Sequence, residues 1–499
     1  MLNAEVNLLF YFLSLFFAFF SRKIFLDNLG TEFIGLTGTL NNILGYLNLT
    51  ELGISASIGY FLFKPLQSND RQEIQNIVSL LGYLYYWIGG VILAGAVLVS
   101  LFFPLIFANA NLSLAIIYFA FYSFLGSSLI GYFINYRQVL LNADQKGYLV
   151  AIYFETANLL RLGLQIYLAY TYKNLYLWVA VEFLFSILGC ILLNWKINKE
   201  YPWLQVNKQL GRKLLKQYPD VILKTRQVFI HKIKDFVLIR SDELFVFIFV
   251  SLKMVAYYGN YLLIIAKVDL LFNAALDSVK ASVGNLVAEG DKQKTMKVFW
   301  ELMAIRHFIA GFLCYSIYSF IEPFISLWLG SEYILSRNIL VLLVVYLYIS
   351  HTRKAVDIYN HAYGLYADTW SAWTELAINV SCTILFGIFY GIVGILLGKI
   401  ISIGIIAVFW KPYYLFSQGF HLPYATYWRG AIRYHVVFAI AFAASMLLSR
   451  HIAINPAAGY LSWILYCLAS VALFLLLQAT GFCLFTLGAK DLLRRIRTK

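Results

Sequence analysis

The sequence is poor in charge. Asp, Glu, Lys and Arg make up 13% of its 499 residues, whereas they make up about a quarter of a soluble globular protein. Hydrophobic residues account for 61% and aromatic residues for 18%. No polar stretch is long enough to fold by itself, which argues against a separate soluble catalytic module. The composition therefore predicts one integral, polytopic membrane protein.

The sequence also lacks the motifs of metal and nucleotide sites. Its five cysteines stand singly in apolar runs, without the spacing that zinc needs, and we interpret them as core residues. Its seven histidines form no H-E-x-x-H, and no G-x-x-x-x-G-K-[ST] loop is present for ATP. The loops expected outside the membrane are short, whereas membrane glycosyltransferases generally need charged residues on sizeable ones. We therefore expect a protein that is not an enzyme and has no metal or cofactor.

What the sequence does contain is about fourteen apolar stretches close to the length of a membrane-spanning helix. Their approximate extents are 4–26, 33–63, 76–104, 112–141, 148–171, 174–194, 221–250, 254–288, 297–322, 335–361, 366–390, 392–416, 432–450 and 459–487. The alternating ten-residue pattern of a β-barrel is missing, so we expect an all-α fold. The first stretch has no basic region or cleavage site of a signal peptide, so it is interpreted as a retained span.

Lys and Arg are distributed unequally between the loops. If the N-terminus is cytoplasmic, the inner loops and the C-terminal tail hold 27 of these residues and the outer loops hold four. Inner loops of membrane proteins are enriched in Lys and Arg. The count therefore predicts an even number of spans with both termini in the cytoplasm. Because this asymmetry explains most of the net charge of +14, no nucleic-acid partner is needed.

Eight cations fall in or at the edge of the spans. They are Arg22, Lys23, Arg161, Arg240, Lys267, Lys280, Arg306 and Lys399. Charges at such depth normally face a protein interior or a wet cavity. One interpretation is a cationic, partly hydrated cavity for an anionic solute. The other is that the cations reach the interface or pair with carboxylates, namely Asp27, Glu155, Asp242, Asp269, Asp277 and Glu375.

The eighth stretch is polar on two sides. Asp269, Asn273, Asp277 and Lys280 recur every three or four residues and share one stripe of the helix. The opposite side carries Asn260, Lys267 and Ser278. Such a helix is expected to lie between other helices, where it either lines a cavity or makes interhelical hydrogen bonds.

A weak internal repeat predicts two related lobes of six helices each. Asn69-Asp70-Arg71-Gln72 precedes a span that ends near Pro104, and Gly290-Asp291-Lys292-Gln293 precedes one that ends near Pro323. Chance similarity between apolar sequences is the alternative.

A basic amphipathic helix is expected between the lobes. Its apolar side is formed by Trp203, Val206, Leu210 and Leu214. The predicted divisions are an N-terminal lobe (1–194), a cytoplasmic linker (195–220), a C-terminal lobe (221–416) and two extra spans with a basic tail (417–499).

Six short segments form a pattern that extends over nearly the whole chain. They are RKIFLDNLGTEFIGL (22–36), LNLTELGI (47–54), FKPL (63–66), FVSLKMVAYYGNY (249–261), ASVGNL (281–286) and PFISLWLG (323–330). The pattern resembles the polysaccharide-unit flippases of the multidrug/oligosaccharidyl-lipid/polysaccharide exporter superfamily. The resemblance implies a V-shaped bundle of two six-helix lobes, with two C-terminal spans that hold a lipid tail. It also implies a monomer in the bacterial inner membrane, associated with the polymerase and chain-length machinery of polysaccharide biosynthesis.

The implied activity is movement of undecaprenyl-pyrophosphate-linked oligosaccharides from the inner to the outer leaflet by alternating access. Such oligosaccharides are the repeat units of lipopolysaccharide O-antigen, capsule or exopolysaccharide. The resemblance places a cavity arginine of the family at Arg22 and a polar position of its seventh span at Arg240 with Asp242. A cation-coupled exporter of small amphipathic drugs on the same scaffold is the alternative function, and a structural or scrambling membrane protein is a third.

These considerations together give a set of candidate site residues. Arg22, Lys23, Arg240 and Lys267 are expected to contact the pyrophosphate, because the arginine fork and the lysine ammonium both bind phosphate. The residues expected to contact the sugars are Asn41, Asn42, Asn48 and Asn260. The carboxylates expected to bind a coupling H⁺ or Na⁺, or to pair with the cations, are Asp27, Asp242, Asp269 and Asp277.

Overall fold

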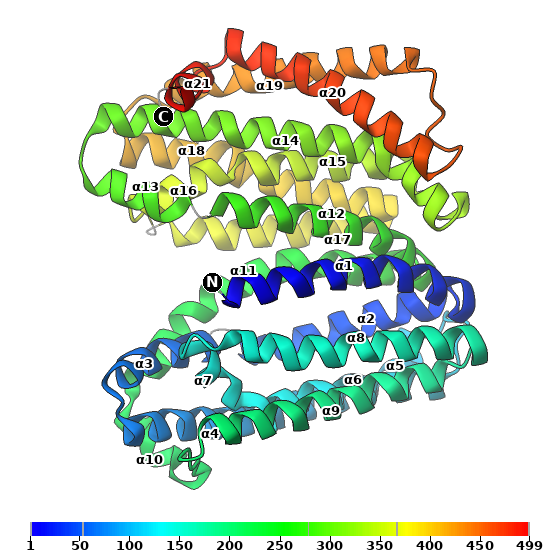
Figure 1. The fold of residues 1–499 in the computed structure, drawn as a ribbon, viewed down its shortest axis with the longest axis vertical. Helices are drawn as coiled ribbons and strands as arrows, with labels where there is room; N and C mark the ends of the chain where they lie inside the picture. Colours follow the sequence, from blue (N-terminus) through cyan, green and yellow to red (C-terminus); the bar gives the residue numbers. More distant parts are fainter. Residues whose placement is uncertain (1, 52–53, 278, 366–367, 498–499) are drawn as a thin grey trace. The chain divides into compact units, whose positions relative to one another are not determined.

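Helices make up every regular element in the part of the chain that the computed structural model describes, residues 2–51, 54–277, 279–365 and 368–497 (Figure 1). Some side chains within these ranges lie outside the description, most of them in 223–240 and 274–281. The all-α fold predicted from the sequence is thus confirmed. The chain divides into two compact units, Met1–Gly259 and Asn260–Lys499, and each is described by itself.

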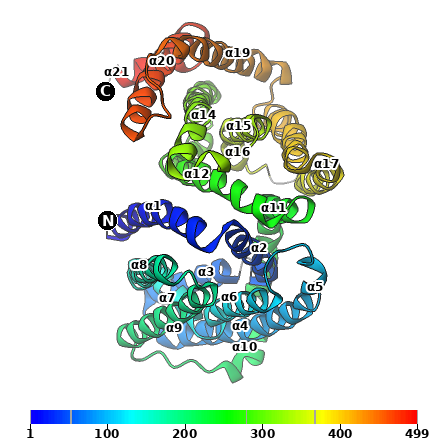
Figure 2. The same ribbon diagram turned by 90° about the vertical axis from the view of Figure 1, so that its right-hand side faces the viewer.

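The first unit is built from neighbouring long helices. Its helices are α1 (Leu2–Leu29), α2 (Thr31–Leu47), α3 (Ile54–Ser68), α4 (Arg71–Ser100), α5 (Phe103–Ile106), α6 (Leu114–Phe133), α7 (Gln138–Ala143), α8 (Gly147–Tyr172), α9 (Leu175–Glu200), α10 (Gly211–Gln217), α11 (Pro219–Phe249) and the start of α12 (Leu252–Asp277). Helices α1, α8, α9, α6 and α4 follow one another side by side (Figures 1 and 2). Helix α11 packs on α2 and α3, so the seventh predicted span belongs to this unit.

The second unit is organised around α14. Its helices are the rest of α12, α13 (Val279–Ala288), α14 (Lys292–Trp328), α15 (Arg337–Thr352), α16 (Lys354–Ala362), α17 (Thr369–Ile403), α18 (Lys411–Tyr414), α19 (Tyr424–Leu448), α20 (Tyr460–Phe485) and α21 (Ala489–Arg497). Helix α14 contacts α15, α16, α19, α20 and α21. Its side chains Phe299 and Trp300 lie in an aromatic core with Tyr359, Phe416 and Tyr434. The two C-terminal helices α19 and α20 therefore pack on the same helix as the rest of the unit.

Ten segments of the described residues are long and apolar enough to cross a membrane. The longest, Trp370–Gly419, contains two helices, because Gly391 has φ 56° and ψ −132° and interrupts α17. This kink falls at the predicted boundary between the stretches 366–390 and 392–416. The two parts of Trp370–Gly419 bring the ten segments to eleven spans. The α2–α3 pair, α8 and α11 are further long helical segments, so the described chain agrees with about fourteen spans. The chain is a multi-pass membrane protein.

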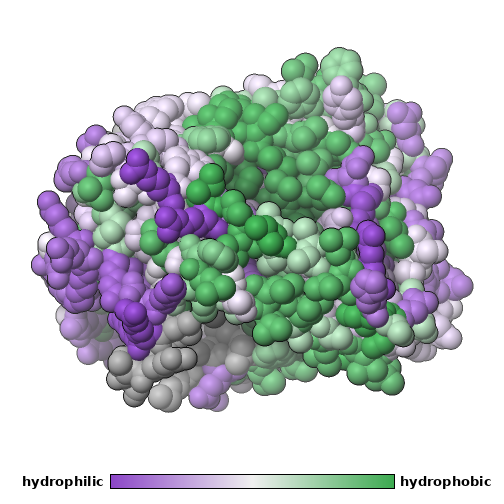
Figure 3. All heavy atoms as spheres, turned by 90° about the horizontal axis from the view of Figure 1, so that it is seen from above, coloured by the Kyte–Doolittle hydropathy of each residue, from purple (hydrophilic) through white to green (hydrophobic). Residues whose placement is uncertain are grey.

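A band of apolar side chains covers the face that carries α19 and α20 (Figure 3). Ile440, Leu461, Leu468, Leu476 and Leu484 are among its exposed residues. Polar residues gather at the two ends of this band. So large an exposed apolar surface does not suit water, and its pattern agrees with helices that cross a hydrocarbon layer.

The internal repeat corresponds to the same local structure in both units. Asp70 caps α4 by accepting a hydrogen bond from Glu73 N at 3.0 Å, and Asp291 caps α14 by accepting one from Lys294 N at 3.0 Å. The residue before each cap has a positive φ, 53° at Asn69 and 77° at Gly290. Both sequences therefore turn the chain and start a helix in the same way. The predicted lobe boundaries at 194 and 221 stay a prediction.

The linker differs from the amphipathic helix that its sequence pattern predicts. Helix α9 extends to Glu200, and after it helical structure begins only at the 3₁₀ turn Lys208–Leu210. The segment packs on α4, since Gln75 Nε2 donates to Trp203 O at 2.7 Å and Tyr218 OH donates to Glu73 Oε2 at 2.6 Å. The prediction of one helix from Trp203 onward was wrong, because contacts with α4 fix an irregular chain there.

Candidate functional site

A partly buried polar cluster forms in the first unit where α1, α2, α11 and the start of α12 meet. The Arg22 guanidinium of α1 donates from Nη2 to Ala256 O at 3.1 Å. Asn42 of α2 is 2% exposed, and its Nδ2 donates to the Glu243 carboxylate of α11. Asp242 is 4% exposed and accepts a hydrogen bond from Tyr258 OH at 3.4 Å. We call these residues, with Gly259, the Arg22 cluster.

Two glycines allow the helices of this cluster to approach closely. A Cβ on Gly259 would lie 3.3 Å from Arg22 Nη2 and 3.9 Å from Glu243 Oε1. The guanidinium and the carboxylate therefore approach the same point of α12. A Cβ on Gly35 of α2 would lie 1.9 Å from Leu252 O, so only glycine lets the start of α12 reach α2.

Among the described side chains, the Arg22 cluster combines one cation, two carboxylates and one amide, of which Asn42 and Asp242 are buried and Arg22 and Glu243 are partly exposed. Buried charges are tolerated when they are paired and hydrogen-bonded. Arg22 Nη2 donates here to a neutral carbonyl, and a guanidinium is a donor fork of the kind that suits a carboxylate or phosphate. Asp242 and Glu243 are groups that can take up a proton or a cation. The cluster thus has the chemistry for an anion and for a coupling ion.

The other candidates of the first unit whose side chains are described lie elsewhere. Lys23, Asp27 and Asn41 are exposed, and Asn41 Nδ2 donates to Thr37 O of its own helix at 2.9 Å. Asn48 Oδ1 accepts a hydrogen bond from Ser128 Oγ at 3.2 Å. The side chain of Arg240 lies outside the described residues. The structure therefore brings Arg22, Asn42 and Asp242 into one region, whereas no described contact joins Lys23, Asp27, Asn41 or Asn48 to them.

In the second unit the polar stripe of α12 faces α15 and α16. Asp269 Oδ1 lies 2.6 Å from His351 Nε2, and the Asn273 side chain accepts a hydrogen bond from Lys354 Nζ. Both contacts agree with the stripe predicted from their four-residue spacing. The side chain of Asp277 lies outside the described residues, Lys267 is partly exposed, and Asn260 is fully buried. The described partner of Asp269 is therefore a histidine, His351.

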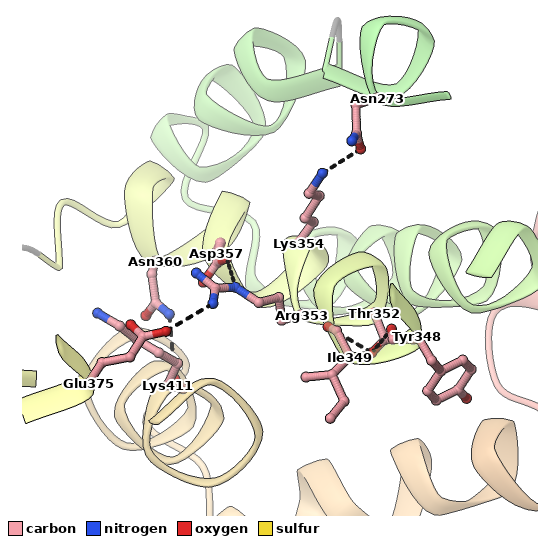
Figure 4. A network of polar contacts seen from close by, with 10 residues as sticks. All are labelled: Asn273, Tyr348, Ile349, Thr352, Arg353, Lys354, Asp357, Asn360, Glu375 and Lys411. Carbon is pink, nitrogen blue, oxygen red and sulfur yellow. Dashed lines mark hydrogen bonds and ion pairs between the residues drawn. The ribbon is translucent and has the colours of Figure 1, made fainter. Parts of the chain in front are cut away.

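A polar network continues from this point along α15, α16 and α17 (Figure 4). Arg353 Nε donates to Asp357 Oδ2 at 2.9 Å, and its Nη1 lies 3.4 Å from Glu375 Oε1. Glu375 is 4% exposed. Arg353 and Lys354 leave the helices in different directions, Lys354 toward Asn273 (Figure 4). At the break between α15 and α16, Arg353 thus contacts α17 and the next residue, Lys354, contacts α12.

Several of the span cations are bound in ways that the sequence did not indicate. Arg161 pairs with Glu182 of α9, and Gln165 shares the same carboxylate at 3.1 Å. The Lys399 ammonium lies 4.4 Å from the centre of the Tyr346 ring. Glu182 and Glu243 were not among the candidates, because spacing along a helix shows which face is polar but not which residue lies opposite. A carboxylate following Asp242 was the signal that could have indicated Glu243.

Comparison with known proteins gives matches to solved structures. No protein-family model and no curated protein matches the chain. The lipid II flippase MurJ, in an inward closed conformation, superposes with a TM-score of 0.68 at 16% identity, over 99% of this chain and all of that one. An inward-facing multidrug resistance MATE family transporter of the MOP superfamily gives 0.57 at 13% identity, over 80% and 93%.

The chain has the fold of these transporters. The MurJ match includes nearly every residue and therefore also α19 and α20, the two helices beyond the predicted twelve. The MATE match leaves about a fifth of the chain uncovered. Of the two, MurJ thus matches the fourteen-span organisation more completely.

Proposed function

We propose that this protein is a flippase that moves a lipid-linked oligosaccharide across the membrane by alternating access. The observation that carries the proposal is the match to MurJ over 99% of the chain and all of that structure. MurJ is named for its action on lipid II, a lipid-linked substrate. The sequence resemblance to polysaccharide-unit flippases supports the same class of cargo.

In its finer form, the proposal is that the cargo is an undecaprenyl-pyrophosphate-linked repeat unit of O-antigen, capsule or exopolysaccharide. It moves from the inner to the outer leaflet of a bacterial inner membrane, and both termini are cytoplasmic, as the distribution of Lys and Arg favours. The protein works as a monomer, coupled to H⁺ or Na⁺, next to the polymerase and chain-length machinery. Its role is transport and not catalysis.

Arg22 is the residue best suited to the pyrophosphate. Its guanidinium belongs to the Arg22 cluster, where Nη2 donates to the carbonyl of Ala256, an uncharged acceptor, at 3.1 Å. A phosphate oxygen is a stronger acceptor for this fork, because charge-assisted hydrogen bonds are about twice as strong as neutral ones. Asn42, bound to Glu243 in the same cluster, offers an amide to sugar hydroxyl groups. Lys23, Arg240 and Lys267 remain candidates for the same head group.

The second candidate function is a cation-coupled exporter of small amphipathic compounds. The observation that favours it is the presence of two carboxylates, Asp242 and Glu243, in the Arg22 cluster. Together they outweigh the charge of Arg22, the one cation among the described side chains of the cluster, and such a site binds cations. The partial match to the MATE transporter agrees with this alternative.

The test is leaflet access of a fluorescent lipid-pyrophosphate oligosaccharide in proteoliposomes. Wild type should move the lipid, and Arg22→Ala and Arg240→Ala should move it more slowly. For Arg22 the expected loss is about 10- to 100-fold, since a hydrogen bond to a charged group contributes about 1.5–3 kcal/mol. Arg337→Ala is the matched control, because Arg337 pairs with Glu322 at an exposed position.

Three outcomes would change the proposal. If wild type leaves the lipid in place but accumulates small cations against a gradient, the exporter replaces the flippase. If the lipid equilibrates in both directions without any gradient and the arginine variants behave as wild type, the protein is a scramblase. If Arg22→Ala and Arg337→Ala lose the same fraction of activity, Arg22 has a structural role only.

A further inference from the structure

A carboxylate surrounded by hydroxyl groups lies in the first unit, at the break between α2 and α3. Glu51 is the last residue of the 3₁₀ turn Asn48–Glu51. Its Oε1 accepts hydrogen bonds from Tyr85 OH at 2.6 Å and from Ser55 Oγ at 3.0 Å, and its Oε2 accepts one from Tyr132 OH at 2.9 Å. We call Glu51, Ser55, Tyr85 and Tyr132 the hydroxyl cluster.

The cluster is enclosed by protein but remains accessible at the carboxylate. Tyr85 of α4 is 3% exposed and Tyr132 of α6 is 5% exposed, whereas Glu51 is partly exposed. Tyr85 is in the middle of the thirty residues of α4, one of the membrane-spanning segments. A small ion could therefore reach the carboxylate, while the tyrosine hydroxyl groups stay in place behind it.

No basic side chain contacts Glu51 within the part of the chain whose side chains are described. The titratable groups that face it are Tyr85 on α4 and Tyr132 on α6. Lys208 lies near the end of α6, but its ammonium donates to Phe133 O at 3.2 Å. Tyr46 of α2 packs against Phe236 instead.

Two other carboxylates of the helices have an arginine or a histidine as partner. Glu182 pairs with Arg161, and Asp269 lies against His351. Glu51 instead has three hydroxyl groups as partners, which are dipoles and do not cancel its charge. Among the described side chains no cation compensates this charge, and a charge in a membrane-spanning region is costly, so a bound monovalent cation would stabilise this arrangement.

We propose that the hydroxyl cluster is the binding site of the monovalent cation that drives transport, with Glu51 as its charged ligand. The proposal rests on the proposed transport function and adds the coupling site to it. The cation is H⁺ or Na⁺. As H⁺, one proton from the water on one side binds the Glu51 carboxylate, which becomes neutral, and leaves to the water on the other side. As Na⁺, the carboxylate and the three hydroxyl oxygens provide oxygen ligands, which hard cations prefer.

The position of the cluster explains how ion binding acts on the cargo site. The hydrogen bonds of Glu51 join the break of the second span to α4 and α6. Asn42 of the Arg22 cluster lies nine residues before Glu51 on the same span. When a cation occupies the carboxylate, the three hydroxyl groups must reorient, because they can no longer all donate to it. This change is transmitted along α2 to Asn42.

The first test measures ion binding without transport. The Tm of the purified protein in lipid nanodiscs is measured in two series. The first varies the pH from about 5 to about 9 in KCl. The second varies the ratio of NaCl to KCl at constant ionic strength. If the ion is Na⁺, wild type should show a saturable rise in Tm with NaCl that Glu51→Gln lacks. If the ion is H⁺, Glu51→Gln should instead remove part of the pH dependence of Tm and leave NaCl without effect.

The matched control is Glu73→Gln. Glu73 also accepts a hydrogen bond from a tyrosine, Tyr218, at 2.6 Å, but it lies in the first turn of α4. This variant should keep the ion response of wild type. Tyr132→Phe retains the Glu51 charge and removes one hydroxyl ligand, so it should weaken the apparent affinity for the ion several-fold. It also serves as the test if Glu51→Gln does not fold. Wild-type responses to both pH and NaCl in Glu51→Gln and Tyr132→Phe would overturn the proposal.

The second test separates this proposal from the proposed function. In proteoliposomes an imposed H⁺ or Na⁺ gradient should accelerate lipid movement by wild type and by Glu73→Gln, but not by Glu51→Gln. If Glu51→Gln still responds to the gradient, the cluster is not the coupling site, although the flippase function stands. If wild type moves no lipid but Glu51→Gln loses the ion response of Tm, the ion site stands and the flippase function fails.

Discussion

Gly259 lies where α12 approaches Arg22 and Glu243, and it leaves little room for a side chain. Replacing it by valine should push the guanidinium and the Glu243 carboxylate away from α12. The added Cβ alone would lie 3.3 Å from Arg22 Nη2 and 3.9 Å from Glu243 Oε1, and the two methyl groups of valine need more room. We expect lipid movement to fall about tenfold, since overpacking typically costs about 1–3 kcal/mol. The proteoliposome assay measures this loss.

The control for this change is Gly59→Val on α3. Nothing lies within 4 Å of a Cβ at Gly59, and the substitution has a similar cost to the helix itself. Gly59→Val should therefore keep its transport activity. Equal losses in both variants would show that the cost comes from the helix backbone and not from displacement of Arg22.

Tyr218 gives the first unit a stability that depends on alkaline pH. Burial, together with the hydrogen bond to Glu73 and the charge of that carboxylate, raises the pKa of Tyr218 to about 12. The unfolded chain loses the same proton near pH 10. The protonated form is therefore favoured by folding, and its stabilising effect is complete below about pH 10 and is lost as the pH rises toward about 12.

The measurement is the Tm of wild type and Tyr218→Phe between about pH 9 and about pH 12. Wild type should lose more stability than the variant over this range. If the Tm of wild type and of Tyr218→Phe falls by the same amount over this range, Tyr218 is not the group that causes the loss of stability. Glu73→Gln removes the negative acceptor but not the burial, so its curve should lie between the two.

At the residue scale, the sequence predicted the types of residue in the site better than their contacts. A charge or an amide in an apolar span is costly, so Arg22, Asn42 and Asp242 stood out without any structure. Their partners did not, because Ala256 O and Glu243 are more than 200 positions away from Arg22 and Asn42 in the chain. Glu51 was visible as a polar residue, but its hydroxyl partners come from α4 and α6.

At the scale of single elements, the caps of α4 and α14 give a direct test of the internal repeat. Asp291→Ala should lower the free energy of unfolding by about 1 kcal/mol, because the helix loses an N-cap acceptor. Asp291→Asn keeps an acceptor oxygen at the same place and should retain most of the stability. Denaturant unfolding in detergent measures both, and Asp70→Ala should behave like Asp291→Ala if the two caps are equivalent.

The limits of helices were predictable where one residue decides them. Gly391 separates two apolar stretches, and Asp70 and Asp291 start helices at positions that a short repeat indicated. The linker shows the opposite case. The spacing of Trp203, Val206, Leu210 and Leu214 fits a helix, but tertiary hydrogen bonds to Gln75 and Ser79 of α4 hold residues 203–207 in an irregular conformation.

At the scale of the whole molecule, the number of spans could be counted from hydropathy, but the grouping of the helices could not. Helix α11 belongs to the first unit because Ser57 Oγ donates to Val221 O at 3.2 Å and Phe107 stacks on Phe247 at 5.1 Å between ring centres. Apolar spans offer many equivalent pairings, so the periodicity of one helix cannot select its neighbour. Contacts between distant positions decide it.

The C-terminal helix provides the last prediction, since α21 closes the second unit by binding α14. Arg495 Nη1 lies 2.9 Å from Glu301 Oε2, and the side chain of Glu301 is 5% exposed whereas that of Arg495 is 57% exposed. Arg495→Ala should lower the free energy of unfolding by about 1–2 kcal/mol, less than for a fully buried pair, because it leaves a buried carboxylate without this partner.

A double-mutant cycle distinguishes this ion pair from general loosening of the C-terminus. Glu301→Gln in the Arg495→Ala background should recover much of the lost stability, because a neutral amide costs less to bury than a carboxylate. Lys490→Ala, at an exposed position of the same helix, should change little. Two results would contradict this interpretation: Lys490→Ala destabilises as much as Arg495→Ala, or Glu301→Gln gives no recovery. The charge on Glu301 would then not hold α21 on α14. The stronger attachment would be the buried contact of Gly488 with the Trp300 backbone.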